Sequence, residues 1–197
     1  MFEILPKFTV EEARIKFLEI LQNTPRFPTN FSKWIIESTD FMSAPASSGS
    51  DNHCSFEGGL LIHSMNVYRR LCQFNELYKI EIPDDSLKVM GLFHDLCKIH
   101  FYEKSKRNVK NNKTGQWESV DYYIINDKMP LDHGHKSVIL LRSLSLSKEE
   151  MYAIAWHLGA WDVQEFGRKC ALREATKISP WVFALQVADQ LATFYDE

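Results

Sequence analysis

The sequence has few cysteines and no pattern that pairs them. The four cysteines lie far apart along the chain, with no Cys-x-x-Cys spacing: Cys54, Cys72, Cys97 and Cys170. This excludes the paired-ligand spacing of a zinc finger and argues against a disulfide framework. We therefore expect reduced thiols and a cytoplasmic protein, in which Cys97 is a small buried side chain.

Long apolar runs and a basic excess are also missing. No apolar segment approaches the roughly 20 residues that a membrane-spanning helix needs. The first residues, Met1 to Pro6, include an acid and no apolar core, so we expect no signal peptide. The formal net charge of −3 excludes a protein that binds polyanions over its whole surface. We therefore expect neither a membrane protein nor a stable complex with nucleic acid.

The sequence does contain helical periodicity in a chain of single-domain size. At 197 residues with 45% hydrophobic residues, one soluble globular domain is expected. Thr9 with Glu12, and Ser147 with Glu150, form capping-box patterns that open two predicted helices. Apolar residues recur at helical spacing in 9–22, 31–38, 60–78, 84–95, 133–144, 147–157 and 180–194, and a polar helix is expected over 168–177.

One segment, residues 101–126, differs from the rest in composition. Aromatic and β-branched residues flank the turn segment Asn111–Gly115, which predicts a β-hairpin inserted in a helical protein. From Lys98 to Lys113 the chain carries six basic residues and one acid, Glu103. The hairpin is either a solvated arm, an oligomer contact, or a flap that attracts an anionic substrate.

The pair His94-Asp95 is the centre of the functional argument. Imidazole nitrogen and carboxylate oxygen are both metal ligands. An isolated pair of this kind is ordinarily a surface ion pair. Here the preceding helix, which Asp84 or Asp85 is expected to cap, is apolar and carries the pair toward the core. Lys98 follows His94 by one turn, where its ammonium can reach a bound anion.

Further metal-ligating side chains occur on other predicted helices. All seven histidines lie between residues 53 and 157. Asp189 lies on an apolar helix with no basic residue within one turn, and a buried carboxylate needs a partner such as a metal ion. Spacing alone does not establish convergence, because a histidine on an apolar helix is ordinarily a core residue. The candidates in chain order are His63, His94-Asp95, His133, His157 and Asp189.

The order of these motifs resembles the HD-domain superfamily of metal-dependent phosphohydrolases. The matching segments are Gly58-Gly59-Leu60-Leu61-Ile62-His63-Ser64, His94-Asp95-Leu96-Cys97-Lys98, Asp132-His133-Gly134-His135-Lys136-Ser137, Trp156-His157-Leu158-Gly159 and Ala188-Asp189-Gln190-Leu191-Ala192-Thr193. The resemblance covers about residues 40–193. It implies a compact all-α bundle with the hairpin of residues 101–126 as an insertion. We expect a single domain over 1–197, in which the helices of residues 1–40 pack on the rest.

The resemblance also implies a site for two divalent metal ions, with Mn, Fe, Mg, Ni and Zn not distinguished. Asp95 is shared between the two implied ligand sets, which are His63, His94, Asp95 and Asp189 for one ion, and His133 and His157 for the other. His135 stands where relatives often have Glu, so either His133 or His135 is the ligand, and His133 is preferred. No Gly-Tyr-Pro follows the second motif, so the cyclic-di-GMP phosphodiesterase branch is not supported.

The implied reaction is hydrolysis of a phosphomonoester or phosphodiester of a nucleotide-type substrate by metal-activated water. Asp95 and Lys98 are the expected catalytic residues, with Lys98 also binding the phosphate. His53 resembles a substrate-facing position of relatives. Tyr102 or Trp117 is available to stack on a base.

Three alternative functions stay open at this point. The diiron oxygenases of the superfamily share the ligand pattern and activate O₂ instead of water. RNA 3′-5′ exonucleases with similar segments carry a further nucleic-acid-binding domain, for which this chain has no room. The intact ligand set argues against a non-catalytic nucleotide-binding module. We expect a small phosphorylated partner, and the sequence leaves open whether the chain forms a homo-oligomer.

Overall fold

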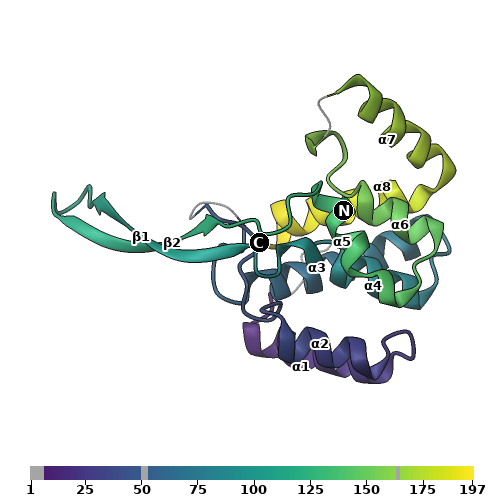
Figure 1. Cartoon of the computed structure of the whole chain (residues 1–197), viewed down its shortest axis with the longest axis horizontal. Coiled ribbons are helices and arrows are strands. Elements are labelled where there is room, and N and C mark those ends of the chain that lie inside the picture. Colours follow the sequence, from purple (N-terminus) through teal and green to yellow (C-terminus); the bar gives the residue numbers. More distant parts are fainter. Residues whose placement is uncertain (1–6, 50–52, 163–164) are drawn as a thin grey trace.

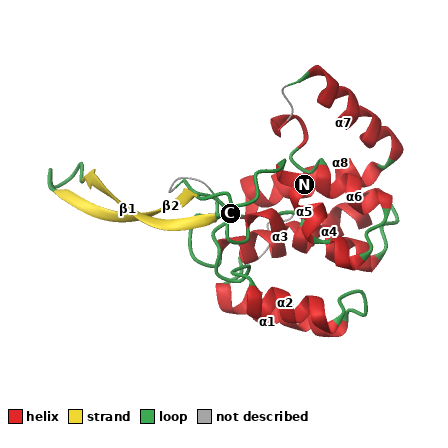
Figure 2. Cartoon of the chain, viewed as in Figure 1, coloured by secondary structure: helices red, strands yellow, loops and turns green. Residues whose placement is uncertain are grey.

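The protein is described by a computed structural model that covers residues 7–49, 53–162 and 165–197. It consists mainly of α-helices, with one antiparallel β-hairpin (Figures 1 and 2), so the expected fold class is confirmed. The prediction about a signal peptide at residues 1–6 lies outside the described residues. The elements are α1 (Val10–Asn23), α2 (Thr29–Ser38), α3 (Gly59–Tyr78), α4 (Asp84–Phe93), β1 (Tyr102–Lys110), β2 (Trp117–Ile125), α5 (His133–Leu140), α6 (Lys148–Ala155), α7 (Phe166–Ile178) and α8 (Pro180–Leu191).

Both predicted capping boxes are present. The Thr9 hydroxyl accepts a hydrogen bond from the backbone N–H of Glu12, whose carboxylate accepts one from the backbone N–H of Thr9. Ser147 and Glu150 make the same reciprocal pair at the start of α6. Each box satisfies backbone donors that a helix start leaves unpaired.

Several helix ends differ from the sequence-based prediction, and two of them bear on the site. The prediction that Asp84 or Asp85 caps α4 is wrong, because Pro83 occupies the cap position without a side-chain hydrogen bond. Both acids instead lie in the first turn, where the helix dipole favours negative charge. The helix expected to run through His157 ends at Ala155. His157 therefore lies in the turn that follows α6.

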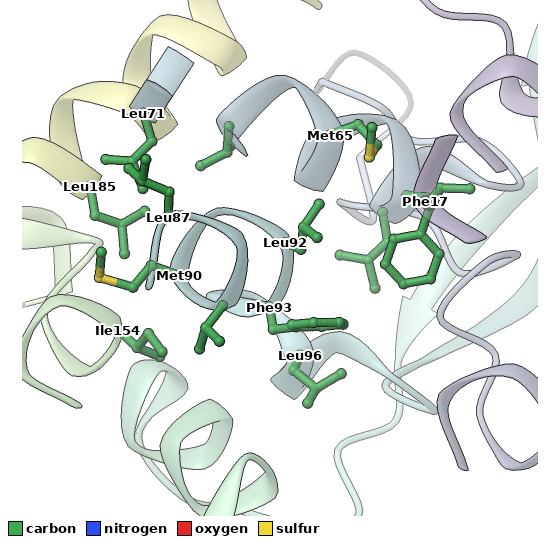
Figure 3. Close-up of a cluster of buried hydrophobic side chains, with 14 of the residues drawn as sticks. Phe17, Met65, Leu71, Leu87, Met90, Leu92, Phe93, Leu96, Ile154 and Leu185 are labelled. Atoms are coloured by element: carbon green, nitrogen blue, oxygen red, sulfur yellow. The ribbon is translucent and has the colours of Figure 1, made fainter. Parts of the chain in front are cut away.

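Helix α4 runs through the centre of the core. Met90, Leu92 and Phe93 are fully buried. Figure 3 shows them among buried side chains of four other helices: Phe17 of α1, Leu71 of α3, Ile154 of α6 and Leu185 of α8. Burying a side chain of this size stabilises the fold by about 1.5–3 kcal/mol. Because α4 is covered by other helices, the pair His94-Asp95 that follows it lies inside the molecule.

An aromatic cluster joins the N-terminal helices to α4. The Phe93 ring lies 5.3 to 5.9 Å, centroid to centroid, from the rings of Phe17, Phe27, Phe31 and Phe41. The pairs with Phe17, Phe27 and Phe31 are edge-to-face, and such pairs contribute about 0.5–1.5 kcal/mol beyond the area that they bury. Helices α1 and α2 therefore share one core with the end of α4.

The hairpin extends away from the helical body (Figure 1). Its strands pair from Tyr102 with Ile125, next to the body, to Lys110 with Trp117, next to the turn. Most of its side chains are exposed. Among the described residues, no helix of the molecule is long and apolar enough to cross a membrane.

A buried ion pair fixes the segment after α8. This segment is a π-helical turn, Ala192–Asp196, where the sequence predicted α-helix through residue 194. Arg70 Nε of α3 donates a hydrogen bond of 2.7 Å to Asp196 Oδ2, and both side chains are buried. The pair holds the turn against α3 and brings Glu197 beside the N-terminal half of that helix.

Candidate metal centre

The six side chains predicted to hold metal come from five parts of the fold and meet in one place. The pair His94-Asp95 directly follows α4, which the core buries. The other four come from the N-terminal part of α3, the first residue of α5, the turn after α6 and the last turn of α8: His63, His133, His157 and Asp189. Whether they bind metal stays a prediction, but their convergence is a property of the fold.

Two glycines let these helices approach closely enough. A Cβ on Gly91 would lie 2.5 Å from Cα of Tyr68, so α4 crosses α3 at a distance that only glycine permits. A Cβ on Gly134 would lie 2.3 Å from the carbonyl oxygen of Ala155, where α5 meets α6. Each glycine lies within three residues of a predicted ligand, so each close approach sets the position of a histidine.

Asp95 lies between two groups of histidines and turns one carboxylate oxygen toward each. Its Oδ2 is 3.5 Å from His63 Nε2 and 3.7 Å from His94 Nε2. Its Oδ1 is 2.6 Å from His133 Nε2 and 3.3 Å from His157 Nε2. A carboxylate in this position can bridge two cations.

Asp189 completes the first group. Its Oδ1 lies 3.2 Å from His63 Nε2, which is in turn 3.2 Å from His94 Nε2. These three side chains each offer one ligand atom within a space that one metal ion can fill, and so do His94, Asp95 and His157. Nitrogen and oxygen donors of this kind suit divalent first-row metals.

The outer nitrogens of the histidines are also engaged. His63 Nδ1 lies 3.1 Å from a carboxylate oxygen of Glu197. His94 and His157 each donate from Nδ1 to the backbone carbonyl three residues earlier, at 3.1 and 2.7 Å. This is the pattern that fixes metal-binding imidazoles, because it leaves the lone pair of Nε2 facing inward. Within the described part of the chain, Nε2 of His157 is buried and makes no hydrogen bond, so the residues present fit a bound cation.

The electrostatics of the centre point the same way. Burial lowers the pKa of His63, but the nearby Glu197 and Asp189 carboxylates outweigh it and raise that pKa to about 10. Burial opposes ionisation of Asp95, yet Lys98 and the surrounding imidazoles hold its pKa well below the usual range. The carboxylates thus remain charged only with cations beside them. A bound metal ion can supply this positive charge in place of the proton on a histidine ring.

Lys98 and His53 both face the main cavity. Lys98 Nζ lies 2.7 Å from Asp95 Oδ2. The His53 ring lies 5.2 Å from the His63 ring. The cavity measures about 880 Å³ and is lined by His53, Cys54, Ser55, Phe56, His63, Asp95, Lys98, Leu158, Trp161, Asp189, Gln190, Thr193, Phe194 and Glu197. The metal centre therefore opens into a space large enough for an organic ligand.

Neither of the two aromatic residues predicted to stack on a base is among the side chains that line this cavity. Trp117 is 71% exposed and pairs with Lys110 beside the turn of the hairpin, which extends away from the helical body (Figure 1). Tyr102 is half-buried at the base of the hairpin, where its hydroxyl donates to the carbonyl of Ala46. Among the basic residues between Lys98 and Lys113, Lys104 stays near the helical body through an ion pair of 2.8 Å with Glu57.

The structure places His133, and not His135, beside Asp95. His133 faces Asp95, whereas the His135 ring packs against Trp156 and its Nδ1 lies 3.8 Å from the exposed carboxylate of Asp132. Cys97 Sγ lies 3.4 Å from both ring nitrogens of His133. Burial raises the pKa of the Cys97 thiol to about 12, so this cysteine packs beside His133 as a neutral thiol.

Sequence reasoning missed several residues at the site. Glu197 belongs to no motif, and its place beside His63 depends on the tertiary fold. Phe56, Trp161 and Phe194 line the cavity from three separate segments. Trp161 and Phe194 lie close in sequence to His157 and Asp189, which was the available signal for both.

Comparison with known proteins agrees with this geometry. A family model, the HD domain, matches residues 60–193, a range that contains all six predicted ligands. No curated protein and no solved structure matches the chain. The match spans more than half of the chain. The chain therefore belongs to the HD-domain family, within a superfamily of metal-dependent phosphohydrolases.

Proposed function

We propose that this protein hydrolyses a phosphomonoester or phosphodiester of a nucleotide-type substrate, with two divalent metal ions in its centre. One observation carries the proposal: Oδ2 of Asp95 faces His63 and His94, and Oδ1 faces His133 and His157. A site for a single ion does not need the second pair. A dinuclear site suits phosphoryl transfer, which requires charge stabilisation on both sides of phosphorus.

The ligands divide between the ions around Asp95. When bound, divalent ions supply Lewis acidity, which lowers the pKa of a water molecule and offsets the charge of the phosphoryl group. The protein residues hold those ions and exclude bulk water, because His63, His94 and His157 are nearly inaccessible. One ion would bind His63, His94, Asp95 and Asp189, and the other Asp95, His133 and His157.

Two further residues of the cavity would act on the substrate directly. The neighbouring Asp95 carboxylate outweighs burial and raises the pKa of Lys98, so its ammonium stays charged and can bind a phosphate oxygen. Burial lowers the pKa of His53, so its imidazole is neutral at pH 7 and can donate or accept one hydrogen bond. These residues would orient the phosphate and stabilise the charge that develops on it.

The cavity volume supports an organic phosphate instead of inorganic phosphate or a very small ester. At about 880 Å³ it falls within the range of about 300–1,000 Å³ for sites that bind organic ligands. A phosphate alone would leave most of this space to water. The substrate therefore needs a group of nucleotide size attached to its phosphate.

The test is a metal-dependent activity screen on protein purified without chelators. Elemental analysis should find two ions per chain. Phosphate release from nucleoside monophosphates, or cleavage of nucleotide diesters, should follow addition of Mn²⁺, Mg²⁺, Fe²⁺ or Ni²⁺. An Asp95→Asn protein purified in parallel corrects for contaminating phosphatases. Hydrolysis that does not exceed this control with any metal would refute the proposal, and O₂ consumption by the iron-loaded protein would favour an oxygenase.

A further inference from the structure

Three large aromatic side chains line the exposed part of the cavity that also reaches the metal centre, and this part is called the cavity mouth. Phe56, Trp161 and Phe194 all line this cavity, and they are 47%, 78% and 72% exposed. The floor of the same cavity carries Asp95 and Lys98. The cavity thus has a charged floor and an aromatic mouth. A ligand that fits it needs a charged group at one end and an apolar group at the other.

The aromatic residues come from three segments that are far apart in the chain. Phe56 lies in the turn before α3, and Phe194 lies in the π-helical turn after α8. Trp161 lies in a 3₁₀ turn, Gly159–Asp162, which starts from Gly159 at φ +57°, a conformation that favours glycine. Leaving such side chains in water forgoes the stabilisation that burial would give. Their gathering at one opening indicates a flat apolar ligand.

Two polar side chains line the same cavity as the aromatic residues and the metal centre. Gln190 and Thr193 line the cavity next to Asp189, one helical turn apart. A side-chain amide offers both donors and an acceptor, and a hydroxyl offers one of each. Nucleobases present donors and acceptors on their edges and a flat apolar face for stacking. The aromatic side chains can contact the flat face of a base, and Gln190 and Thr193 can bind its edge.

We propose that Phe56, Trp161 and Phe194 form a base-binding subsite, in which the nucleobase stacks at the mouth while the phosphate lies at Lys98 and the metal centre. Gln190 and Thr193 contact the edge of the base. Like the proposed function on which it rests, this subsite takes a nucleotide, and it assigns base recognition to the cavity mouth and not to Tyr102 or Trp117 of the hairpin. Stacking contributes between about fivefold and 150-fold in affinity for each base.

The experiment measures binding separately from turnover. The Mn²⁺-loaded protein is titrated by calorimetry with nucleoside 5′-phosphonates, in which a CH₂ group replaces the 5′ oxygen and prevents hydrolysis. The four common bases are compared with the corresponding ribose phosphonate, which has no base. The wild-type protein should bind at least one nucleoside phosphonate at least about fivefold more tightly than the ribose phosphonate. Trp161→Ala should remove most of that ratio, and Trp161→Phe should keep most of it.

Matched variants identify the surface responsible. Phe183→Ala also removes an exposed aromatic side chain from α8, but Phe183 does not line the cavity, so both affinities should stay at wild-type values. Equal affinity of wild-type protein for phosphonates with and without a base would overturn the subsite. So would a ratio that survives Trp161→Ala and Phe194→Ala but falls in Trp117→Ala, because the hairpin would then hold the base. A protein that shows the ratio yet hydrolyses no phosphoester would keep the subsite and refute the proposed hydrolysis.

Discussion

Asp95→Asn is the substitution that the geometry predicts most completely. It keeps the size of the side chain and removes the charge that Lys98 contacts at 2.7 Å. Removing one partner of a buried ion pair costs about 3–5 kcal/mol. Because Lys98 borders an open cavity, we expect the lower end, about 3 kcal/mol, in the metal-free protein. For a domain of this size that corresponds to a Tm lower by about 6–12 °C.

The larger effect should appear when metal is added. Wild-type protein with Mn²⁺ at about 100 to 1,000 times Kd gains about 2.7–4.1 kcal/mol, so its Tm should rise by about 5–15 °C. The variant loses a ligand of both ions and should show little of this rise. Differential scanning fluorimetry measures the Tm of the metal-free protein in EDTA and the rise in Tm with MnCl₂. Phosphoester hydrolysis by the variant should fall to background.

A matched surface variant separates the loss of the Asp95 carboxylate from the loss of any one negative charge. Asp84→Asn makes the same chemical change in an exposed carboxylate that pairs with Lys88. Exposed pairs contribute about 0–1 kcal/mol, so its Tm should change little and its response to Mn²⁺ should be complete. An Asp95→Asn protein that keeps the wild-type metal response and normal turnover would refute the bridging role.

Three further predictions concern individual residues. His133→Ala should lower the metal content from two ions to one while His135→Ala keeps two, and elemental analysis with the opposite result would make His135 the ligand. Glu197→Gln weakens the hold on His63 Nδ1 and should lower Mn²⁺ affinity about 10- to 100-fold in chelator competition; unchanged affinity would show that Glu197 does not orient His63. Lys98→Met should lower kcat at least about tenfold, equivalent to about 1.4 kcal/mol, because phosphate charge loses its nearest protein cation. A steady-state kcat equal to wild type would locate the phosphate elsewhere.

Local sequence signals predicted the helices well. Thr9 with Glu12 and Ser147 with Glu150 identified two helix starts, because a capping box involves only residues within one turn. The helix-to-turn change before His157 was not predictable, because Gly134 packs against that end of α6 from α5. Periodicity indicates which face of a helix is apolar, but it does not show where a neighbouring helix will pack and end that helix.

The candidate site was predictable only in part. Motif order and the resemblance indicated six ligands, and the fold brings those six together. Glu197 could not be found this way, since the Arg70–Asp196 pair that positions it joins residues 126 positions apart. Trp117 was chosen for its chemistry, although the turn at Asn111–Gly115 already implied a position near the tip. At roughly 3.3 Å per residue, strand β1 separates that tip from Tyr102 by about 25 Å.

The meeting of distant segments at Asp95 has a kinetic consequence. His63 and the Glu197 that supports it are 134 residues apart, so the complete centre exists only after most of the chain has closed. Closing so long a loop costs entropy that one metal ion cannot recover before the helices have packed. Apolar packing around α4 must therefore form first, and metal binding follows it. Bound ions should then slow unfolding while leaving the refolding rate nearly unchanged, because they stabilise the native state and not the transition state before it.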